Sequence, residues 1–264
     1  MTDAPSFREE YISQIPAVRL LKALGYTYLT PAEALDLRGG YPNAVILDGI
    51  PSHQHHNGGR LAFGPDGYLY VTTGDARQED RAQDTDSLAG KILRLTPTGE
   101  PAPGNPFGNA VWSYGHRNVQ GIGWTSDGRM YASEFGTNEF DELNLIQPGG
   151  NYGWPDIEGW AGRSGFIDPL VTWPTDEASP SGITVTDEGV WMTALRGETL
   201  WFIPLDPGGE VGEPRRHRLG IGRLRDVVTA PDGSLWVMTS NTDGRGRPKA
   251  GDDRILRLVI RPPS

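Results

Sequence analysis

Apolar and polar residues alternate along most of the chain, and four stretches repeat one pattern. In each of them an apolar segment runs into a turn that ends in glycine, and a second segment with aromatic or branched residues follows. The four stretches read LAFGPDGYLYVTTGD, IGWTSDGRMYASEFG, ITVTDEGVWMTALRG and VVTAPDGSLWVMTSN. Asp-Gly turns between alternating apolar residues are typical of β-hairpins. We therefore expect four hairpins, one in each stretch.

The turn glycines recur at a nearly regular period. They are Gly67, Gly128, Gly189 and Gly233, spaced by 61, 61 and 44 residues. Repeats of this length that each contain a hairpin predict the blades of a β-propeller. A β-sandwich is the alternative, but it would not explain the period. We expect an all-β fold of the propeller type.

The first 42 residues differ from the rest of the chain. Their apolar residues follow a helical spacing, at Tyr11, Ile12, Ile15, Val18, Leu20, Leu21 and Leu24. Thr30-Pro31 has the form of an N-cap followed by proline at the first helical position, and Gly39-Gly40 would end that second helix. We expect a helical segment over 1–42 and a β-domain over 43–264.

Composition narrows the class of protein. The chain has 264 residues, with 36 glycines and 22 prolines, which favours short strands joined by turns. Its formal net charge of −10 argues against nucleic acid as a partner. No run approaches the roughly 18 apolar residues of a membrane span. Cysteine is absent, which excludes thiolate chemistry. The first residues, MTDAPSFREE, do not have the form of a secretory signal, and the compartment stays open.

Three of the five histidines lie within the stretch HQHH at 53–56, just before a predicted strand. A histidine cluster on a loop is often only a solvated loop, and this one lacks the Cys partners or the i, i+4 spacing of a zinc site. Asp75 follows the second strand of the same hairpin. A carboxylate at that place is able to orient a histidine across the mouth of the hairpin.

Three further stretches carry candidate chemistry. GHRNVQG places Arg117 and Asn118 in a glycine-bounded turn, where they would bind a carboxylate or quinone oxygen or simply tie one blade to the next. GRLRD places Arg223 and Arg225 on one strand face, and such a pair requires an anion or a carboxylate partner. The stretch 135–155 mixes acids, amides and glycines, which suits calcium. In NTDGRGRPKAGDD, Arg245 stands at a ligand position and argues against a calcium loop.

Taken in order, these motifs resemble those of the soluble quinoprotein glucose/sorbosone dehydrogenases. The resemblance runs from about Asn43 to Leu258 and includes HHNGGRLAFGPDGYLYVTTGD, SYGHRNVQG, DELNLIQPGGNYGWP and GRLRDV. Members of that family are six-bladed propellers that use pyrroloquinoline quinone and calcium to oxidise aldose sugars to lactones, and pass the electrons to an external acceptor. They are usually periplasmic or secreted. The resemblance implies the same fold, cofactors and substrate class here.

The resemblance also implies roles for individual residues. His56 matches the general base that takes the proton of the anomeric hydroxyl, and Asp75 matches the carboxylate that orients its imidazole. Arg117 would stabilise negative charge as hydride reaches the quinone. The positions that match contacts to the quinone are Arg117, Asn118, Arg196, Arg223 and Arg225. His53 and His55 match no function of the family, and we expect them to be loop residues.

Calcium would be held in part by the backbone carbonyls of Gly136 and Thr137. The family motif there is His-Gly-Pro or Gln-Gly-Pro, whereas this chain has Phe135-Gly136-Thr137, and the backbone lacks the restraint of the proline. Some relatives bind a second calcium through the glutamate of Asp-Glu-Leu-Asn and the tyrosine of Asn-Tyr-Gly-Trp. Glu142 and Tyr152 match these two residues.

The family has two further blades before the catalytic histidine, where this chain has residues 1–42. That segment resembles the extreme N-terminus of type I restriction enzyme motor subunits, without their nuclease or helicase motifs. We therefore expect an incomplete propeller of about four blades, with exposed strand edges and a tendency to self-associate. The alternative to a sugar dehydrogenase is an inactive truncated propeller that serves as a binding or scaffold module.

Overall fold

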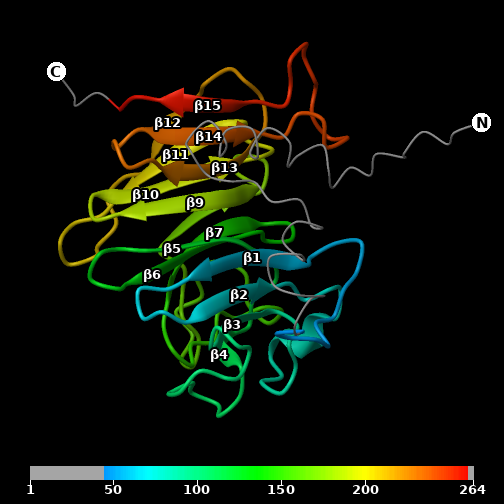
Figure 1. Cartoon of the computed structure of the whole chain (residues 1–264). Coiled ribbons are helices and arrows are strands. Elements are labelled where there is room, and N and C mark those ends of the chain that lie inside the picture. The colour runs from blue at the N-terminus through cyan, green and yellow to red at the C-terminus, as the bar shows by residue number, and fades with distance from the viewer. Residues whose placement is uncertain (1–44, 261–264) are drawn as a thin grey trace, which may run out of the picture.

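The computed structural model describes residues 45–260 (Figure 1). Within them the only helical element is the short 3-10 helix η1 (Glu79–Ala82), and all other regular structure is strand. The helical prediction for 1–42 lies outside the described residues. None of the helices in the described part of the chain has the length and hydropathy to cross a membrane.

The strands form four antiparallel sheets, each a meander in chain order. The first contains β1 (Gly58–Phe63), β2 (Leu69–Thr73), β3 (Lys91–Leu95) and β4 (Val111–Tyr114). The second contains β5 (Val119–Trp124), β6 (Met130–Glu134), β7 (Phe140–Ile146) and β8 (Val171–Pro174). The third contains β9 (Pro180–Thr186), β10 (Gly189–Ala194), β11 (Thr199–Pro204) and β12 (Arg215–His217). The fourth contains β13 (Leu224–Thr229), β14 (Leu235–Thr239) and β15 (Ile255–Leu258).

Each predicted hairpin forms the first two strands of one sheet. In the first sheet, for example, Phe63 pairs with Leu69 across the turn that contains Gly67. Gly67 has a φ of 78°, in the left-handed region that a turn of this kind requires and that glycine adopts without strain. The propeller prediction is confirmed, and the sandwich alternative is not what the chain forms.

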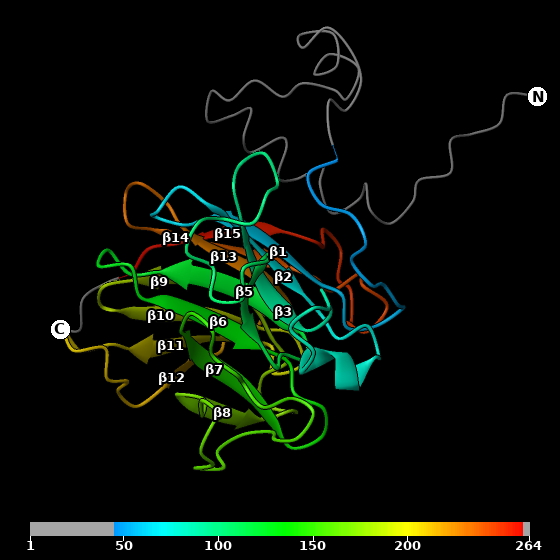
Figure 2. The ribbon, with the colours of Figure 1, turned by 90° about the horizontal axis from the view of Figure 1, so that it is seen from below.

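The sheets follow one another as blades. In Figure 1 they run from β13–β15 at the top to β1–β4 at the bottom, and Figure 2 shows them from below. The first strands contact each other in series, β1 with β5, β5 with β9, and β9 with β13. This is the arrangement that places the first strand of every blade nearest to a common axis.

Apolar clusters hold each sheet to the next. Tyr131 and Leu143 of the second sheet pack with Met192 and Ile203 of the third, and all four side chains are fully buried. Similar clusters join the first sheet to the second and the third to the fourth. Burying a side chain of this size stabilises the fold by about 1.5–3 kcal/mol. The apolar residues that alternate along the strands thus pack each blade against the next.

Candidate residues lie at the same end of three of the four first strands. Asn57 and Asn118 directly precede β1 and β5, and Arg223 directly precedes β13. At this end the ladder of each first hairpin contains a register shift. Such bulges redirect side chains and are frequent beside functional sites. The blades therefore bring residues that are distant in sequence to one end of the axis.

The strand interpretation of Arg223 and Arg225 needs a correction. Arg223 lies before β13, which begins at Leu224, and the ladder shifts register between Leu224 and Asp226, at Arg225. Strict alternation therefore does not explain why these two side chains share a side. The bulge places them there instead.

Candidate active site

A cavity of about 710 Å³ opens at this end of the axis. That volume lies within the range of pockets that hold small organic ligands, about 300–1,000 Å³. The predicted residues that line it are His56, Arg117, Asn118, Gly136, Thr137, Arg196, Arg223 and Arg225. Asp75 is buried directly behind His56, and Glu142 and Tyr152 line a smaller pocket that shares Arg117 and Gly136 with the first.

His56 and Asp75 form a close pair. The Nδ1 atom of His56 lies 2.8 Å from Oδ1 of Asp75, and the imidazole is 11% exposed toward the cavity. The backbone of His56 has a φ of 60°, uncommon for a residue with a side chain and frequent at functional sites. Its carbonyl lies so near Gly74 that a Cβ at that position would collide with the oxygen. Only glycine at position 74 lets the histidine loop approach the strand end this closely.

The partners of His56 define its protonated nitrogen. Arg117 places a guanidinium nitrogen 2.8 Å from Nε2 of the imidazole. A guanidinium has only donors, so Nε2 must accept, and in the neutral ring the proton is then on Nδ1, which donates to Asp75. The Nε2 lone pair is therefore on the cavity side. This is the tautomer that a base at this position requires.

Asp75 accepts hydrogen bonds at both of its oxygens. Oδ1 also accepts from the backbone N–H of Arg77 at 2.8 Å, and Oδ2 accepts from the indole N–H of Trp154 at 2.8 Å. Burial by itself raises the pKa of Asp75, but the hydrogen bonds from His56, Arg77 and Trp154 outweigh it, so the pKa is lowered. Asp75 is thus held as a carboxylate behind the imidazole.

Arg117 lies between His56 and the loop of the predicted calcium carbonyls. Its guanidinium donates to the carbonyl of Gly136 as well as contacting His56 Nε2. Its Nε is buried and has no hydrogen-bond partner among the described residues. Burial lowers the pKa of Arg117, opposed by the negative charges of Asp75 and Glu134.

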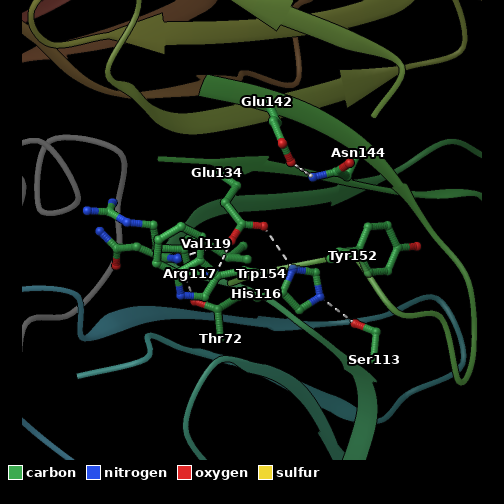
Figure 3. A network of polar contacts seen from close by, with 12 residues as sticks. Thr72, Ser113, His116, Arg117, Val119, Glu134, Glu142, Asn144, Tyr152 and Trp154 are labelled. Atoms are coloured by element: carbon green, nitrogen blue, oxygen red, sulfur yellow. Dashed lines mark hydrogen bonds and ion pairs between the residues drawn. The ribbon is translucent and has the colours of Figure 1, made fainter. Parts of the chain in front are cut away.

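The backbone at Arg117 is fixed by a buried network that sequence reasoning missed (Figure 3). Glu134 accepts from the backbone N–H groups of Arg117 and Asn118, the second at 3.1 Å. The other oxygen of Glu134 lies 2.8 Å from Nδ1 of His116, whose Nε2 lies 2.9 Å from the hydroxyl of Ser113. One carboxylate thus holds three consecutive residues. The histidine in GHRN is the only sign of this network in the sequence.

Asn118 uses its side-chain oxygen within the fold. The oxygen accepts from the backbone N–H of Gly58 at 3.0 Å and from the amide of Gln120 at 3.0 Å. This contact ties the start of β5 to the start of β1, next to the histidine loop. The amide NH₂ of Asn118 is the part left for a ligand.

Arg223 and Arg225 share a carboxylate partner, which comes from the stretch NTDGRGRPKAGDD. The Nε and one terminal nitrogen of Arg223 donate to Asp243 Oδ2 at 3.1 and 3.0 Å, and Arg225 lies 3.6 Å from the same oxygen. Burial lowers the pKa of Arg225, and Asp243 opposes that shift. One carboxylate for two arginines leaves positive charge facing the cavity. Arg245 of the same loop also lines it.

Asp141 is a second buried acid that the sequence did not single out. Its oxygens accept from the backbone N–H of Gly136 at 3.0 Å and of Ser179 at 2.6 Å. Burial raises its pKa to about 7, against the effect of these two bonds. The side chain fixes the loop of Gly136 and Thr137, two residues that line the cavity.

Glu142 and Tyr152 are not oriented toward each other. The Glu142 carboxylate accepts from the backbone N–H of Gly159 at 2.7 Å and from Asn144 at 3.1 Å, while the Tyr152 hydroxyl donates to the Leu145 carbonyl at 2.7 Å. Burial, followed by the charge of Glu134, raises the pKa of Glu142 to about 8. Within residues 45–260, no cluster of three or more histidine and acidic side chains would hold a metal. A calcium ion here would depend on backbone carbonyls.

The remaining predicted residues lie at the rim. Arg196 is exposed where it lines the cavity, and His53 and His55 are exposed loop residues, although His55 borders the mouth.

The chain matches the family model described as glucose / sorbosone dehydrogenase over residues 40–257. The PQQ-bound aldose sugar dehydrogenase from Streptomyces coelicolor superposes with a TM-score of 0.76 at 58% identity, covering 80% of this chain and 64% of that one. Aldose sugar dehydrogenase YliI of Escherichia coli is 34% identical, over 72% of this chain and 58% of its own length. Quinoprotein glucose dehydrogenase B of Acinetobacter calcoaceticus is 39% identical, over 53% of this chain and 33% of its own length. The chain thus spans less than two thirds of the length of each of these proteins.

Proposed function

Because the chain belongs to the glucose/sorbosone dehydrogenase family, we propose that it oxidises aldose sugars to lactones, with pyrroloquinoline quinone as the hydride acceptor and calcium as its metal. The PQQ-bound relative and the two sugar dehydrogenases it resembles support this reaction class. The observation that carries the proposal is the pairing of a base with an arginine-rich cavity. His56 presents Nε2 to a space that Arg117, Arg223 and Arg225 surround.

The cavity suits the chemistry of the cofactor. Pyrroloquinoline quinone carries three carboxylates and a pair of quinone oxygens. Arginine forks match carboxylates in two-point hydrogen bonds, and Arg223 and Arg225 stand together to provide them. The guanidinium of Arg117 and the NH₂ of Asn118, two residues that line the cavity, are donors for the quinone oxygens. When bound, the quinone accepts the hydride from C1 of the sugar.

His56 would move the proton in the same step. Its Nε2 takes the proton of the O1 hydroxyl while the C1–H bond breaks, so the sugar loses one proton and one hydride and becomes the lactone. Asp75 keeps the Nδ1 proton in place and stabilises the imidazolium that forms. The sugar hydroxyl must first replace Arg117 as the donor to Nε2. Arg117 would then be free to stabilise the negative charge that the hydride brings to the quinone.

Calcium would lie at the carbonyls of Gly136 and Thr137. The Gly136 carbonyl already accepts from the guanidinium of Arg117, so its oxygen is directed at a cationic group. Carbonyl oxygens are ligands that calcium prefers, and Asp141 holds this loop from behind. We propose Glu142 and Tyr152 for a second calcium, with carbonyls of the neighbouring loops as further ligands; binding would require the Glu142 carboxylate to exchange its hydrogen bonds from Gly159 and Asn144 for the ion.

The proposal is tested by adding quinone and calcium to the purified chain and following the quinone spectrum when glucose is added. We expect the bound quinone to be reduced. His56→Asn should still bind the quinone but reduce it about 10²- to 10⁴-fold more slowly, because the base is lost. His53→Asn, a change on the exposed part of the same loop, is the matched control and should behave as the wild type.

The alternative function is a binding or scaffold module on the same propeller. Quinone that binds without a response to any aldose, or that does not bind at all, would favour it.

A further inference from the structure

We propose that Trp154 is a positioning residue that fixes the His56–Asp75 pair through its indole N–H. The roles of His56 and Asp75 rest on the function proposed above, but the contact itself belongs to the described structure. Trp154 Nε1 lies 2.8 Å from Asp75 Oδ2, and Trp154 comes from the loop after β7, 79 residues away from Asp75.

Asp75 has no access to water that could replace this donor. Its exposure is 0%, and its other oxygen already accepts from His56 and from the backbone of Arg77. Without the indole N–H, Oδ2 is a buried acceptor with no donor, and the carboxylate gains freedom to rotate about its Cβ–Cγ bond. Rotation would move Oδ1 away from Nδ1 and release the imidazole. The indole therefore acts on His56 through Asp75.

Trp154 is itself held in place by polar contacts. Its backbone N–H donates to the Gly115 carbonyl at 2.9 Å, and its carbonyl accepts from the amide of Gln83 at 2.7 Å. Gln83 and Asn151 exchange two hydrogen bonds, at 3.0 and 2.7 Å. The indole thus belongs to a rigid support, and its N–H has a fixed direction.

The ring of Trp154 also contacts Arg117. The guanidinium carbon lies 5.3 Å from the centre of the ring, within the range of a cation–π contact. One residue therefore touches both the carboxylate that orients the base and the arginine that borders it. Trp154→Phe separates the two contacts, because phenylalanine keeps an aromatic face and loses only the N–H.

We expect Trp154→Phe to lower kcat for glucose about 5- to 50-fold, the effect of removing a hydrogen bond from a charged buried group. The quinone Kd should stay within about threefold of the wild-type value, since no quinone contact is removed. Trp236→Phe is the control, because the Trp236 indole N–H is buried without a partner among the described residues and its removal costs no hydrogen bond. Equal losses of kcat in the two variants would overturn the proposal.

A readout independent of sugar turnover is the titration of Asp75, followed by carboxyl ¹³C NMR on the chain without quinone. Loss of a donor should raise the pKa of Asp75 in Trp154→Phe, and the acid limb of kcat/KM should move in the same direction. The other charged groups around Asp75 are His56, Arg77 and Arg117, and all are unchanged in the variant. An unchanged Asp75 titration would refute the positioning role even if sugar oxidation itself is not observed.

A double-mutant cycle with Asp75→Asn shows whether Trp154 acts through Asp75. In Asp75→Asn the amide NH₂ faces either the indole N–H or the imidazole. Adding Trp154→Phe to this variant should therefore cause no further loss of activity, and should restore part of the lost activity because the indole N–H no longer opposes the amide. Additive losses would contradict the proposal. If Trp154→Phe does not fold, the indole N–H resonance of Trp154 in Asp75→Asn provides the test. It should shift upfield and exchange with solvent faster than in the wild type. An unchanged resonance overturns the inference.

Discussion

Replacing Asp75 by asparagine should disable His56, the proposed base, while leaving the cavity intact. The carboxylate receives three donors, the Nδ1–H of His56 and the N–H of Arg77 on Oδ1 and the indole N–H of Trp154 on Oδ2, each at 2.8 Å. An amide has one oxygen, so it cannot accept from both sides. With the oxygen toward His56, the NH₂ opposes the indole N–H. With the oxygen toward Trp154, the NH₂ faces Nδ1 and favours the tautomer with the proton on Nε2.

The magnitude follows from what is lost. A positioned base contributes about 10²- to 10⁴-fold to the rate, and the wrong tautomer removes most of it. We expect kcat for the reduction of bound quinone by glucose to fall in this range, with the quinone Kd within about threefold of wild type. One buried donor without an acceptor should also cost about 1–3 kcal/mol of unfolding free energy.

Stopped-flow reduction of the quinone and a quinone titration measure the two quantities, and ¹⁵N NMR of the His56 imidazole shows the tautomer directly. The exposed Asp206, which accepts from the Glu210 N–H at 2.8 Å, provides the control Asp206→Asn. An Asp75→Asn variant that keeps kcat within about threefold of wild type would refute the reasoning, as would a wild-type imidazole with its proton on Nε2.

The lowered pKa of Asp75 adds a pH dependence. A carboxylate with a depressed pKa stabilises the fold at pH values above its unfolded pKa of about 3.9, and the stabilisation is lost as pH falls through the folded pKa. The difference in unfolding free energy between wild type and Asp75→Asn should therefore be largest near neutral pH and shrink below about pH 4. A difference that grows on acidification would contradict this sign.

Three further perturbations test other parts of the site and fold. Arg225→Ala should raise the quinone Kd roughly 10- to 100-fold, as expected for a lost charge-assisted contact, whereas Arg257→Ala, at an exposed pair with Asp232, should leave it unchanged in the same titration. Lys91→Met should lower the unfolding free energy by about 2–4 kcal/mol in urea melts, because the fully buried ammonium donates to three backbone carbonyls; a loss below about 1 kcal/mol would show that these carbonyls find other donors. Phe63 is 61% exposed on β1, an apolar surface that favours self-association, which sedimentation of the wild type should show. Phe63→Glu should reduce that self-association, and a wild type that sediments as a monomer would refute the expectation.

Local patterns were sufficient to predict the blades. Alternating apolar residues on both sides of an Asp-Gly turn define a hairpin through contacts a few residues apart, as at Gly67 and Gly233, and the recurrence of that unit defines the stacking of sheets. The strands that follow the first hairpin of each sheet have no turn motif of the same strength. Their pairing depends on contacts between more distant residues, and the repeat alone did not show them.

In the candidate site too, some residues could be predicted from sequence motifs and others only from the packed structure. The family motifs marked His56, Asp75, Arg117, Arg223 and Arg225, and motif spacing alone placed Asp75 close to His56. The partners of these residues carry no motif of their own. Trp154 donates to Asp75 across 79 positions, Asp243 pairs with Arg223 across 20, and Glu134 holds the Arg117 backbone across 17. Burial and hydrogen-bond direction select such partners, and both exist only once the blades are packed.

The sequence by itself therefore determined the repeat and the class of fold, because these are properties of short segments, and its family motifs supplied the side chains that we propose for the chemistry. The tertiary structure alone decided which nitrogen of His56 holds the proton, which oxygen of Asp75 each donor reaches and how the bulge at Arg225 turns its side chain inward. These outcomes depend on ångström-scale distances between segments of different blades, and hydrogen bonding is sensitive to distance and direction at that scale. Residue order along one chain does not encode such distances locally; they follow from the packing of every blade against the next.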